Sequence, residues 1–332
     1  MKKDIKIAAD VMGGDLGPEP LIQGCINFVR KTNTKVVIVG DETLIRKIVE
    51  RENIGYENIE ISHTQQFITM GEKVSKTFRK KRNASVAIAA RLVKSGYCDG
   101  FFTIGNTGSA VLWSRIILKR VKGIKRTALC GALFNKKGIT IILDCGANIK
   151  TGVESFIQFA EMGDVFASSF INQSKPRIGL LNIGKEETKG KFKIQWANHV
   201  LRKSDLNYIG FIEGNDLVKG EVDVAVCDGF TGNIILKYSE AVFSLFSSYD
   251  NVLPDKKEYL KNIFGDAVSN IKKLNGAPLL GVNGISVIGH GASNDIDYES
   301  GLSITKFFIE SNLLERLKQK FENKRTTLTR KV

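Results

Sequence analysis

Histidine is scarce in this chain of 332 residues. The chain has only His63, His199 and His290, and none of them has metal-ligand spacing to another. Histidine-based zinc chemistry is therefore not expected. The five cysteines are odd in number, scattered and without a C-x-x-C pair, so neither a disulfide framework nor a zinc site is indicated. We expect most of them to be small core residues: Cys25, Cys98, Cys130, Cys145 and Cys227.

Long apolar runs are also missing. No run approaches the roughly 18 residues that a membrane-spanning helix needs. The first residues, MKKDIKIAADVMGG, start basic, but Asp4, Lys6 and Asp10 interrupt any signal-peptide core. We therefore expect a cytoplasmic protein. With 42% hydrophobic and 25% charged residues, the chain has the composition of an ordinary globular protein with a full core of its own.

Acidic residues are the minority among the charged ones. The chain has 35 Asp and Glu against 49 Lys and Arg, which gives a net charge of +14. This excess favours acidic partners, which include nucleic acid, anionic lipid, phosphorylated ligands and acidic proteins. A generally basic proteome would give the same sign, so charge alone does not choose among these partners.

Short runs rich in valine and isoleucine alternate with longer segments of helical period. This alternation predicts a three-layer α/β/α fold with a doubly wound, mostly parallel sheet. No internal repeat or low-complexity linker appears, so we expect one domain over residues 1–332. Two successive helical stretches at about 240–275 interrupt the alternation of strands and helices. The predicted strands are 5–11, 35–40, 59–64, 99–105, 140–146, 177–183, 208–214, 222–229 and 285–289, and the predicted helices are 18–31, 43–52, 85–96, 107–121, 154–171 and 192–204.

Glycine, acids and asparagine gather where these strands end. In CDGFTGN we expect the strand to run out into Asp228 and a helix to be opened by Asn233. Ligands of open α/β sheets bind outside the carboxyl ends of the strands, where glycine lets backbone N–H groups approach and helix N-termini favour anions. We therefore expect seven such loops to line one rim: DVMGGD (10–15), IGNTGS (104–109), LDCGAN (143–148), NIGKEETKG (182–190), EGND (213–216), CDGFTGN (227–233) and IGHGASN (288–294).

Two nucleotide-binding motifs are absent from the sequence, and this limits which anion can be expected. No G-x-G-x-x-G occurs, and the nearest approach to a P-loop, residues 184–191, has the wrong spacing and lacks the Ser/Thr. A dinucleotide or a nucleoside triphosphate is therefore not indicated. A small anion such as phosphate fits better, cradled by N–H groups around 13–14 and 105–108, with Lys185 or Lys189 supplying charge.

A set of motifs runs through the chain in a fixed order. They are DVMGGDLGPEP, FRKKRNAS, IGNTGSAV, KGIKRTAL, LDCGAN, QFAEMG, PRIGLLNIGKEETKG, IEGND, CDGFTGNIILK, GAPLLG and HGASN. This set closely resembles the PlsX family, the acyl carrier protein:phosphate acyltransferases, nearly end to end. The resemblance implies a homodimer with an isopropylmalate-dehydrogenase-like or phosphotransacetylase-like α/β/α fold that uses no metal and no nucleotide cofactor.

The resemblance also implies a reaction and its partners. A fatty acyl group would pass from acyl carrier protein thioester to inorganic phosphate, giving acyl phosphate for phospholipid synthesis. Besides these substrates, the implied partners are a second copy of the chain, a membrane surface contacted peripherally and a downstream membrane acyltransferase, but no nucleic acid. The helical segment at about 240–275 would serve dimer or membrane contact.

The implied site residues fall into three groups. The catalytic residues are Lys189, Asp228 and Asn233. The substrate-binding residues are Asp10, Gly13, Gly14, Gly105, Asn106, Thr107, Gly108, Asn148, Lys185 and His290, and the carrier-binding residues are Arg79, Lys80, Lys81 and Arg82. Structural interpretations stand beside these: a solvated loop charge for Lys189, a turn or helix cap for Asp228, Asn106 and Asn233, a structural hydrogen bond for His290, and a solvated charge run for residues 79–82.

The implied reaction requires the protein mainly to position phosphate and to stabilise negative charge. A thiol with a pKa of about 8.5 leaves readily, so a strong general acid is dispensable. The enzyme must hold phosphate within attack distance and donate hydrogen bonds to the oxyanion. A carboxylate such as Asp228 or Asp10 could accept a proton from phosphate. Cys145 stands where the family has valine, so we expect direct attack by phosphate.

Two other classes of function remain open. One is a related enzyme of this fold, either a phosphotransacetylase-like enzyme that uses acetyl-CoA or a decarboxylating dehydrogenase that uses a metal and NAD. The sequence lacks the dinucleotide fingerprint G-x-G-x-x-G, but this is only weak evidence against the dehydrogenase, because that fold class binds NAD without it. The other is a non-catalytic scaffold that binds carrier protein through its basic surface.

Overall fold

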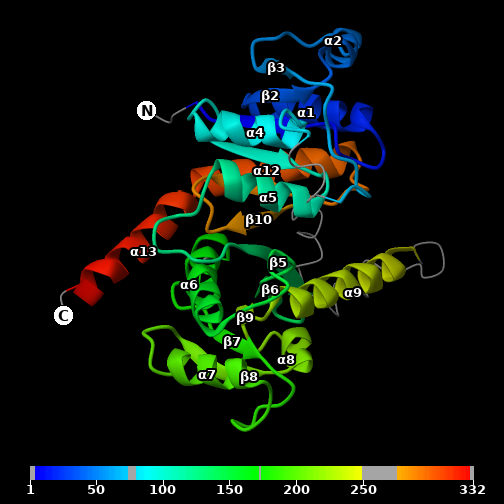
Figure 1. Cartoon of the computed structure of the whole chain (residues 1–332). Coiled ribbons are helices and arrows are strands. Elements are labelled where there is room, and N and C mark those ends of the chain that lie inside the picture. The colour runs from blue at the N-terminus through cyan, green and yellow to red at the C-terminus, as the bar shows by residue number, and fades with distance from the viewer. Residues whose placement is uncertain (1–3, 74–79, 172, 249–274, 330–332) are drawn as a thin grey trace. The chain divides into compact units, whose positions relative to one another are not determined.

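The computed structural model describes residues 4–73, 80–171, 173–248 and 275–329 (Figure 1). Its contacts divide the chain into two compact units. Unit 1 consists of Met1–Val121 and Lys272–Lys318, and unit 2 of Lys122–Ile271 and Gln319–Val332. Each unit is built around its own strands, and a single domain over residues 1–332 stays a prediction.

Unit 1 contains a mostly parallel sheet with the strand order β3-β2-β1-β4-β11-β10. Among the described strands of unit 1, only β10 runs antiparallel, to its neighbour β11. The strand β2 reads KVVIVG and is buried at nearly every position, as expected of a parallel strand covered on both faces. The strands are β1 (Lys6–Asp10), β2 (Lys35–Gly40), β3 (Ile59–His63), β4 (Gly100–Thr103), β10 (Ala277–Leu280) and β11 (Ile285–Ile288).

Two pairs of helices cover this sheet. α1 (Pro18–Thr32) packs on α12 (Asp295–Glu310), and α4 (Ser85–Lys94) packs on α5 (Thr107–Ile117). α2 (Glu42–Arg51) packs on α1 and β3, and its N-cap Asp41 accepts a hydrogen bond from the Thr43 N–H. Between α12 and the sheet, the Tyr298 ring meets Phe102 edge to face with 4.9 Å between centroids. α13 (Leu313–Thr329) follows α12, and the division between the units falls within it.

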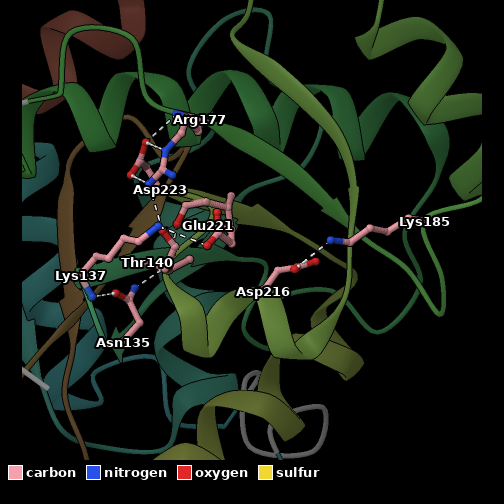
Figure 2. Close-up of polar contacts among 10 residues, drawn as sticks. Asn135, Lys137, Thr140, Arg177, Lys185, Asp216, Glu221 and Asp223 are labelled. Carbon is pink, nitrogen blue, oxygen red and sulfur yellow. Dashed lines mark hydrogen bonds and ion pairs between the residues drawn. The ribbon is translucent and has the colours of Figure 1, made fainter. Parts of the chain in front are cut away.

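Unit 2 contains a second mostly parallel sheet, with the strand order β5-β6-β9-β7-β8. Its antiparallel member is β5, which pairs with β6. Arg177 and Asp223, just before β7 and β9, form a two-pronged ion pair with N–O distances of 2.8 and 3.0 Å that joins the starts of these neighbouring strands (Figure 2). The strands are β5 (Ala128–Asn135), β6 (Gly138–Leu143), β7 (Ile178–Leu181), β8 (Tyr208–Ile212) and β9 (Val224–Val226).

In the described part of unit 2, four helices pack on or beside this second sheet. α6 (Val153–Phe170) packs on β6, β7 and β9, and α7 (Phe192–Leu201) packs on α6 and β8. α8 (Gly214–Lys219) and α9 (Gly229–Ser248) both pack on β5. The close approach of α6 to β9 requires Gly163, because a Cβ there would overlap the Val224 side chain.

The predicted α/β class with mostly parallel strands is confirmed. Most cysteines were expected in the core, and all five are buried. One predicted boundary is wrong: the helix after β9 begins at Gly229 rather than at Asn233. Asp228 caps the helix, so Gly229 and Gly232 lie in its first turn rather than in a loop. The expected helical stretches at 240–275 lie outside the described residues from 249 onward. Among the described residues, no helix is long and apolar enough to cross a membrane.

The sheets place the seven loops at carboxyl edges of parallel strands. In unit 1, the loops after β1, β4 and β11 leave the same edge, because these three strands run parallel. In unit 2, the loops after β6, β9, β7 and β8 leave one edge for the same reason. A single rim that joins all seven loops stays a prediction.

Candidate active site

Asp10 ends β1 inside unit 1 and organises the loops around it. Its carboxylate is buried and accepts hydrogen bonds from the Thr103 hydroxyl at 2.8 Å and the Met12 N–H at 3.2 Å. Burial raises the pKa of Asp10 even though these hydrogen bonds and one from Ser85 oppose the shift. Thr103 in turn accepts from the Gly105 N–H at 3.2 Å. The acid therefore fixes the start of the loop between β4 and α5.

The N-terminus of α5 offers a position for an anion in unit 1. The N-cap Asn106 accepts from the Ser109 N–H at 3.0 Å, while Thr107 and Gly108 are exposed in the first turn. The N–H groups of a first turn have no partner within the helix and carry partial positive charge. The Ser109 hydroxyl is buried and has no hydrogen-bond partner among the described residues. These groups can bind an anion.

A small cavity lies beneath this helix end. Its accessible volume is about 10 Å³, which is room for about one water-sized oxygen. It is lined by Asp10, Gly13, Ile68, Ser85, Val86, Thr103, Gly105, Asn106 and Ser109. Gly13 is needed here because a Cβ on it would lie 2.6 Å from the Gly105 Cα. Gly14 instead faces the core, where a Cβ would lie 2.7 Å from the Ile104 side chain.

Two further loops support the α5 N-terminus. The Asn106 amide donates to the Met70 carbonyl at 2.7 Å. The segment that carries Met70 is fixed by Lys81, whose ammonium reaches the Glu72 carboxylate at 2.6 Å and the Phe67 carbonyl at 2.9 Å. The Asp15 N–H donates to the Gly291 carbonyl at 2.9 Å, which brings the loop after β11 beside the loop after β1.

The predicted carrier-binding residues are not equivalent. Lys81 is half-buried in the ion pair with Glu72, while Lys80 and Arg82 are exposed. Arg79 lies outside the described residues. His290 is exposed, and its Nδ1 accepts from the Ala292 N–H at 3.3 Å, which is the structural hydrogen bond considered for it. Lys80 and Arg82 are therefore the described members of this run that a partner can reach.

In unit 2 the loop after β6 is built on Asp144, which is fully buried. Its carboxylate accepts from the Leu129 N–H at 2.9 Å, the Ala147 N–H at 3.0 Å and the Asn148 N–H at 2.7 Å. Burial raises the pKa of Asp144 against these hydrogen bonds. The Asn148 side-chain amide donates to Asp144 at 2.8 Å and to the Thr127 carbonyl at 2.7 Å. Both amide hydrogens of Asn148 are therefore used within the protein.

The loop after β9 rests against this Asp144 network. The Gly229 N–H donates to the Asn148 carbonyl at 3.1 Å, and a Cβ on Gly232 would overlap the Asp144 carbonyl oxygen. Asp228 accepts from the Thr231 N–H at 2.9 Å and from the Thr231 hydroxyl at 3.0 Å, as an N-cap does. Asn233 is exposed within α9 rather than capping it, and its side chain lies beside Gly146.

Lys189 lies on a loop with a fixed backbone. The Asn182 side chain donates to the Gly184 and Lys189 carbonyls at 3.1 Å each, and Gln195 of α7 donates to the Thr188 carbonyl at 2.8 Å. The Lys189 side chain is exposed and has no ion-pair partner among the described residues. No hydrogen bond or ion pair within the described part of the chain joins it to Asp228 or Asn233. The loop thus presents an uncommitted ammonium group.

Lys185, on the same loop, is already paired. Its ammonium lies 2.9 Å from the buried Asp216 carboxylate at the start of α8 (Figure 2). The hydrogen bond to Asp216 raises the pKa of Lys185. Burial would raise the pKa of Asp216, but the Glu213 N–H and Lys185 outweigh it and leave that pKa lowered. Lys185 therefore joins the NIGKEETKG and EGND loops.

Comparisons with known proteins identify the family. A family model described as "Fatty acid synthesis protein" matches residues 5–316. A phosphate acyltransferase from Pelotomaculum thermopropionicum is 37% identical over 330 residues, with 96% of each chain covered. One from Lawsonia intracellularis is 38% identical over 306 residues, covering 88% of this chain and 87% of the relative. This chain belongs to the PlsX family. Membership makes it an acyltransferase of lipid biosynthesis and confirms the resemblance seen in its motifs.

Solved structures agree with this fold. A phosphotransacetylase from Streptococcus pyogenes superposes with a TM-score of 0.62 at 16% identity, covering 95% of each chain. One from Staphylococcus aureus gives 0.59 at 16% identity, covering 93% of this chain and 94% of that one. At such identity the likeness shows the fold alone, and it is the phosphotransacetylase-like fold expected for a PlsX-family chain.

Three polar residues of these loops were not singled out from the sequence. Asp144 lies in the LDCGAN loop, from which the sequence pattern indicates only Asn148 as a site residue. Its position directly after an apolar strand, like that of Asp10, was the available signal. Thr103 and Ser109 gave no comparable signal, because hydroxyl residues are common near strand ends and in first helical turns.

Proposed function

We propose that this chain transfers a fatty acyl group from acyl carrier protein thioester to inorganic phosphate and so produces acyl phosphate for phospholipid synthesis. The observation that carries the proposal is the match to phosphate acyltransferases across nearly the whole chain, 37% identical with 96% coverage in one case. Family membership supports acyl transfer to phosphate. The proposal goes beyond family membership in two points: the donor is the carrier thioester, and the product is acyl phosphate.

Phosphate is proposed to bind at the N-terminus of α5. The exposed N–H groups of Thr107 and Gly108 favour a dianion, and the Ser109 hydroxyl offers one more donor. The cavity of about 10 Å³ beneath them has room for one phosphate oxygen but not for the whole ion. The rest of the phosphate would therefore stay at the exposed end of the helix, where it can react.

The reaction needs no covalent enzyme intermediate. A phosphate oxygen attacks the thioester carbon, a tetrahedral oxyanion forms, and the C–S bond breaks as the thiolate leaves. The thiolate then takes a proton. Lys189 is proposed to stabilise phosphate or oxyanion charge with its uncommitted ammonium. Asp228 is proposed to accept the proton of monoprotonated phosphate, and Asn233 to donate a hydrogen bond. Lys185 and Asn148 support their loops through the contacts that they make.

The proposal also covers the protein's partners and its location in the cell. We propose a homodimer in the cytoplasm with peripheral membrane contact, which would pass acyl phosphate to a downstream membrane acyltransferase. Lys80 and Arg82 are exposed and available to an acidic carrier. Asn106, Gly13, Gly105 and Asp10 build the phosphate position, while Lys81 holds the segment that contacts Asn106.

A substrate requirement test decides among the enzyme classes. The protein is incubated with phosphate and one of three donors: acyl carrier protein thioester, acyl-CoA, or a hydroxy acid with NAD. Thiol release and acyl phosphate with the carrier thioester support the proposal. Turnover only with the CoA thioester would instead indicate a phosphotransacetylase, and reduction of NAD would indicate a dehydrogenase. Carrier binding without thiol release would indicate a scaffold.

A further inference from the structure

An exposed aromatic stack lies on α7 of unit 2. Phe192 is 74% exposed and Trp196 51% exposed, and their rings stack with 6.2 Å between centroids and 20° between planes. His199 continues the stack, 5.6 Å from Trp196. Large aromatic rings in contact with water are costly to leave uncovered and mark interaction sites when they gather. These three residues are the aromatic face of α7.

The aromatic face is not buried by the described residues of unit 2. The three residues are spaced by four and three positions and so share one side of the helix. The buried residues Ala197, Asn198 and Leu201 lie on the opposite side, where α7 packs on α6 and β8 (Figure 1). The packing of unit 2 therefore leaves the aromatic face free for a partner.

Positive charge surrounds the aromatic face. Lys191 precedes α7 and Lys193 lies in its first turn; both are exposed and neither has an ion-pair partner among the described residues. The helix itself, FKIQWANHVL, contains no acidic residue. Lysine at a helix N-terminus is unfavourable for the helix dipole, so these charges do not stabilise α7. Aromatic rings with a cationic rim suit an acidic partner that also presents apolar side chains.

We propose that the aromatic face of α7, with Lys191 and Lys193, is a docking surface for acyl carrier protein. This inference rests on the proposed function, which requires the chain to recognise an acidic protein. α7 follows directly after the Lys189 loop, and Gln195 of α7 holds that loop by its hydrogen bond to the Thr188 carbonyl. A carrier docked on α7 lies beside the loop that presents the Lys189 ammonium.

A lipid surface fits these observations less well. A helix that lies in a membrane interface immerses a long apolar face. The aromatic face of α7 has two large apolar side chains, and the other side of this ten-residue helix is held against α6 and β8. Docking on a compact acidic protein uses such a small aromatic centre with a charged rim.

The test compares three double variants with the parent. Phe192→Ala/Trp196→Ala removes the stack, and Lys191→Glu/Lys193→Glu reverses the rim charge. The second change places acids at a helix N-terminus, which favours the helix, so lost function cannot be attributed to a lost helix. The matched control is Lys47→Glu/Lys136→Glu, which changes the net charge equally at exposed positions elsewhere.

KM and kcat are measured with acyl carrier protein thioester, and carrier binding is measured directly by calorimetry. Both patch variants should raise KM and Kd for the carrier about 10-fold or more with kcat retained at saturation. The charge variant should also flatten the dependence of KM on salt. The control should stay within about two-fold of the parent, because isolated exposed charges contribute little.

Unchanged KM and Kd in the patch variants would overturn the docking surface, as would an equal rise in the control, which would indicate net charge alone. Loss of binding to phosphatidylglycerol vesicles with intact carrier binding would overturn it in favour of lipid. If the parent binds carrier but forms no acyl phosphate, the proposed function fails, while the effect of the variants on carrier Kd still decides the docking surface.

Discussion

Substitution of Asp228 by Asn distinguishes a structural from a catalytic role, because Asn can cap a helix but cannot accept a proton from phosphate. Its Oδ1 accepts from the Thr231 N–H at 2.9 Å at the start of α9, and its charge faces the positive end of the helix dipole. The cap contributes about 1 kcal/mol to the free energy of unfolding. The charge adds roughly 0.3–1 kcal/mol at low salt.

Two variants divide these contributions. Asp228→Ala loses the cap and the charge, roughly 1–2 kcal/mol in all, which lowers the melting temperature by roughly 1.5–3 °C in a protein of this size. Asp228→Asn keeps an oxygen that accepts from the Thr231 N–H and loses the charge. The oxygen that accepts from the Thr231 hydroxyl becomes an amide NH2, which can donate to that hydroxyl instead. Since salt screens the charge, Asp228→Asn should melt with the parent at about 0.5 M salt, whereas Asp228→Ala should remain less stable.

Activity then decides the proposed proton acceptor. If the carboxylate takes a proton from phosphate, Asp228→Asn should lose about 100-fold in kcat at neutral pH although it stays folded. The assay is acyl phosphate formation from carrier thioester alongside thermal unfolding of the same preparations. An Asp228→Asn variant that keeps kcat within about three-fold of the parent, far less than general-base loss predicts, would leave Asp228 as a cap only. Equal melting of both variants at high salt would refute the cap.

Three further predictions concern other loops. Lys189→Ala should lower kcat about 100- to 1,000-fold with carrier binding retained, and Lys189→Arg should not restore it, because a planar guanidinium places charge differently; retention of more than about a tenth of parental kcat would exclude the role. Cys145→Val should leave activity within a few-fold, because burial raises the pKa of that thiol and so disfavours a thiolate nucleophile; a trapped acyl-cysteine would contradict direct attack. Burial raises the folded-state pKa of Asp10, so its stabilising contribution is present below about pH 4 and is lost as pH rises through that pKa. Between about pH 4 and pH 7, the free energy of unfolding of Asp10→Asn should therefore fall less than that of the parent. Free energies of unfolding that change with pH in the same way in both proteins would contradict this.

The sequence predicts the central elements of both units because their strands are apolar and their helices periodic. It does not reveal β5, whose residues ALCGALFN mix small and apolar types without a strand signature. It also misses α12, although Asn294 and Asp297 form a capping box that can be read from the order of residues. α9 was placed four residues late because glycines usually mark loops, whereas here Gly232 lies in a helix that passes close to the Asp144 carbonyl.

For the loops too, only part of the structure can be predicted from the sequence. Position after a strand predicts that Asp10, Asn106 and Lys189 lie at a carboxyl edge, and the structure places them there. Which polar groups remain available depends on partners far apart in the chain. Lys185 is paired with Asp216 and Lys81 with Glu72, whereas Lys189 has no ion-pair partner among the described residues. Residue type and spacing do not encode such pairing, because it depends on side-chain directions within the folded loops.

Labelled phosphate tests the central claim most directly. The protein is incubated with acyl carrier protein thioester and [³²P]phosphate, and both the released carrier thiol and the labelled acyl product are counted. The account predicts one labelled acyl phosphate for each thiol released, with no release when phosphate is omitted. Thiol release that continues without phosphate, or that yields free fatty acid without label, would contradict acyl transfer to phosphate.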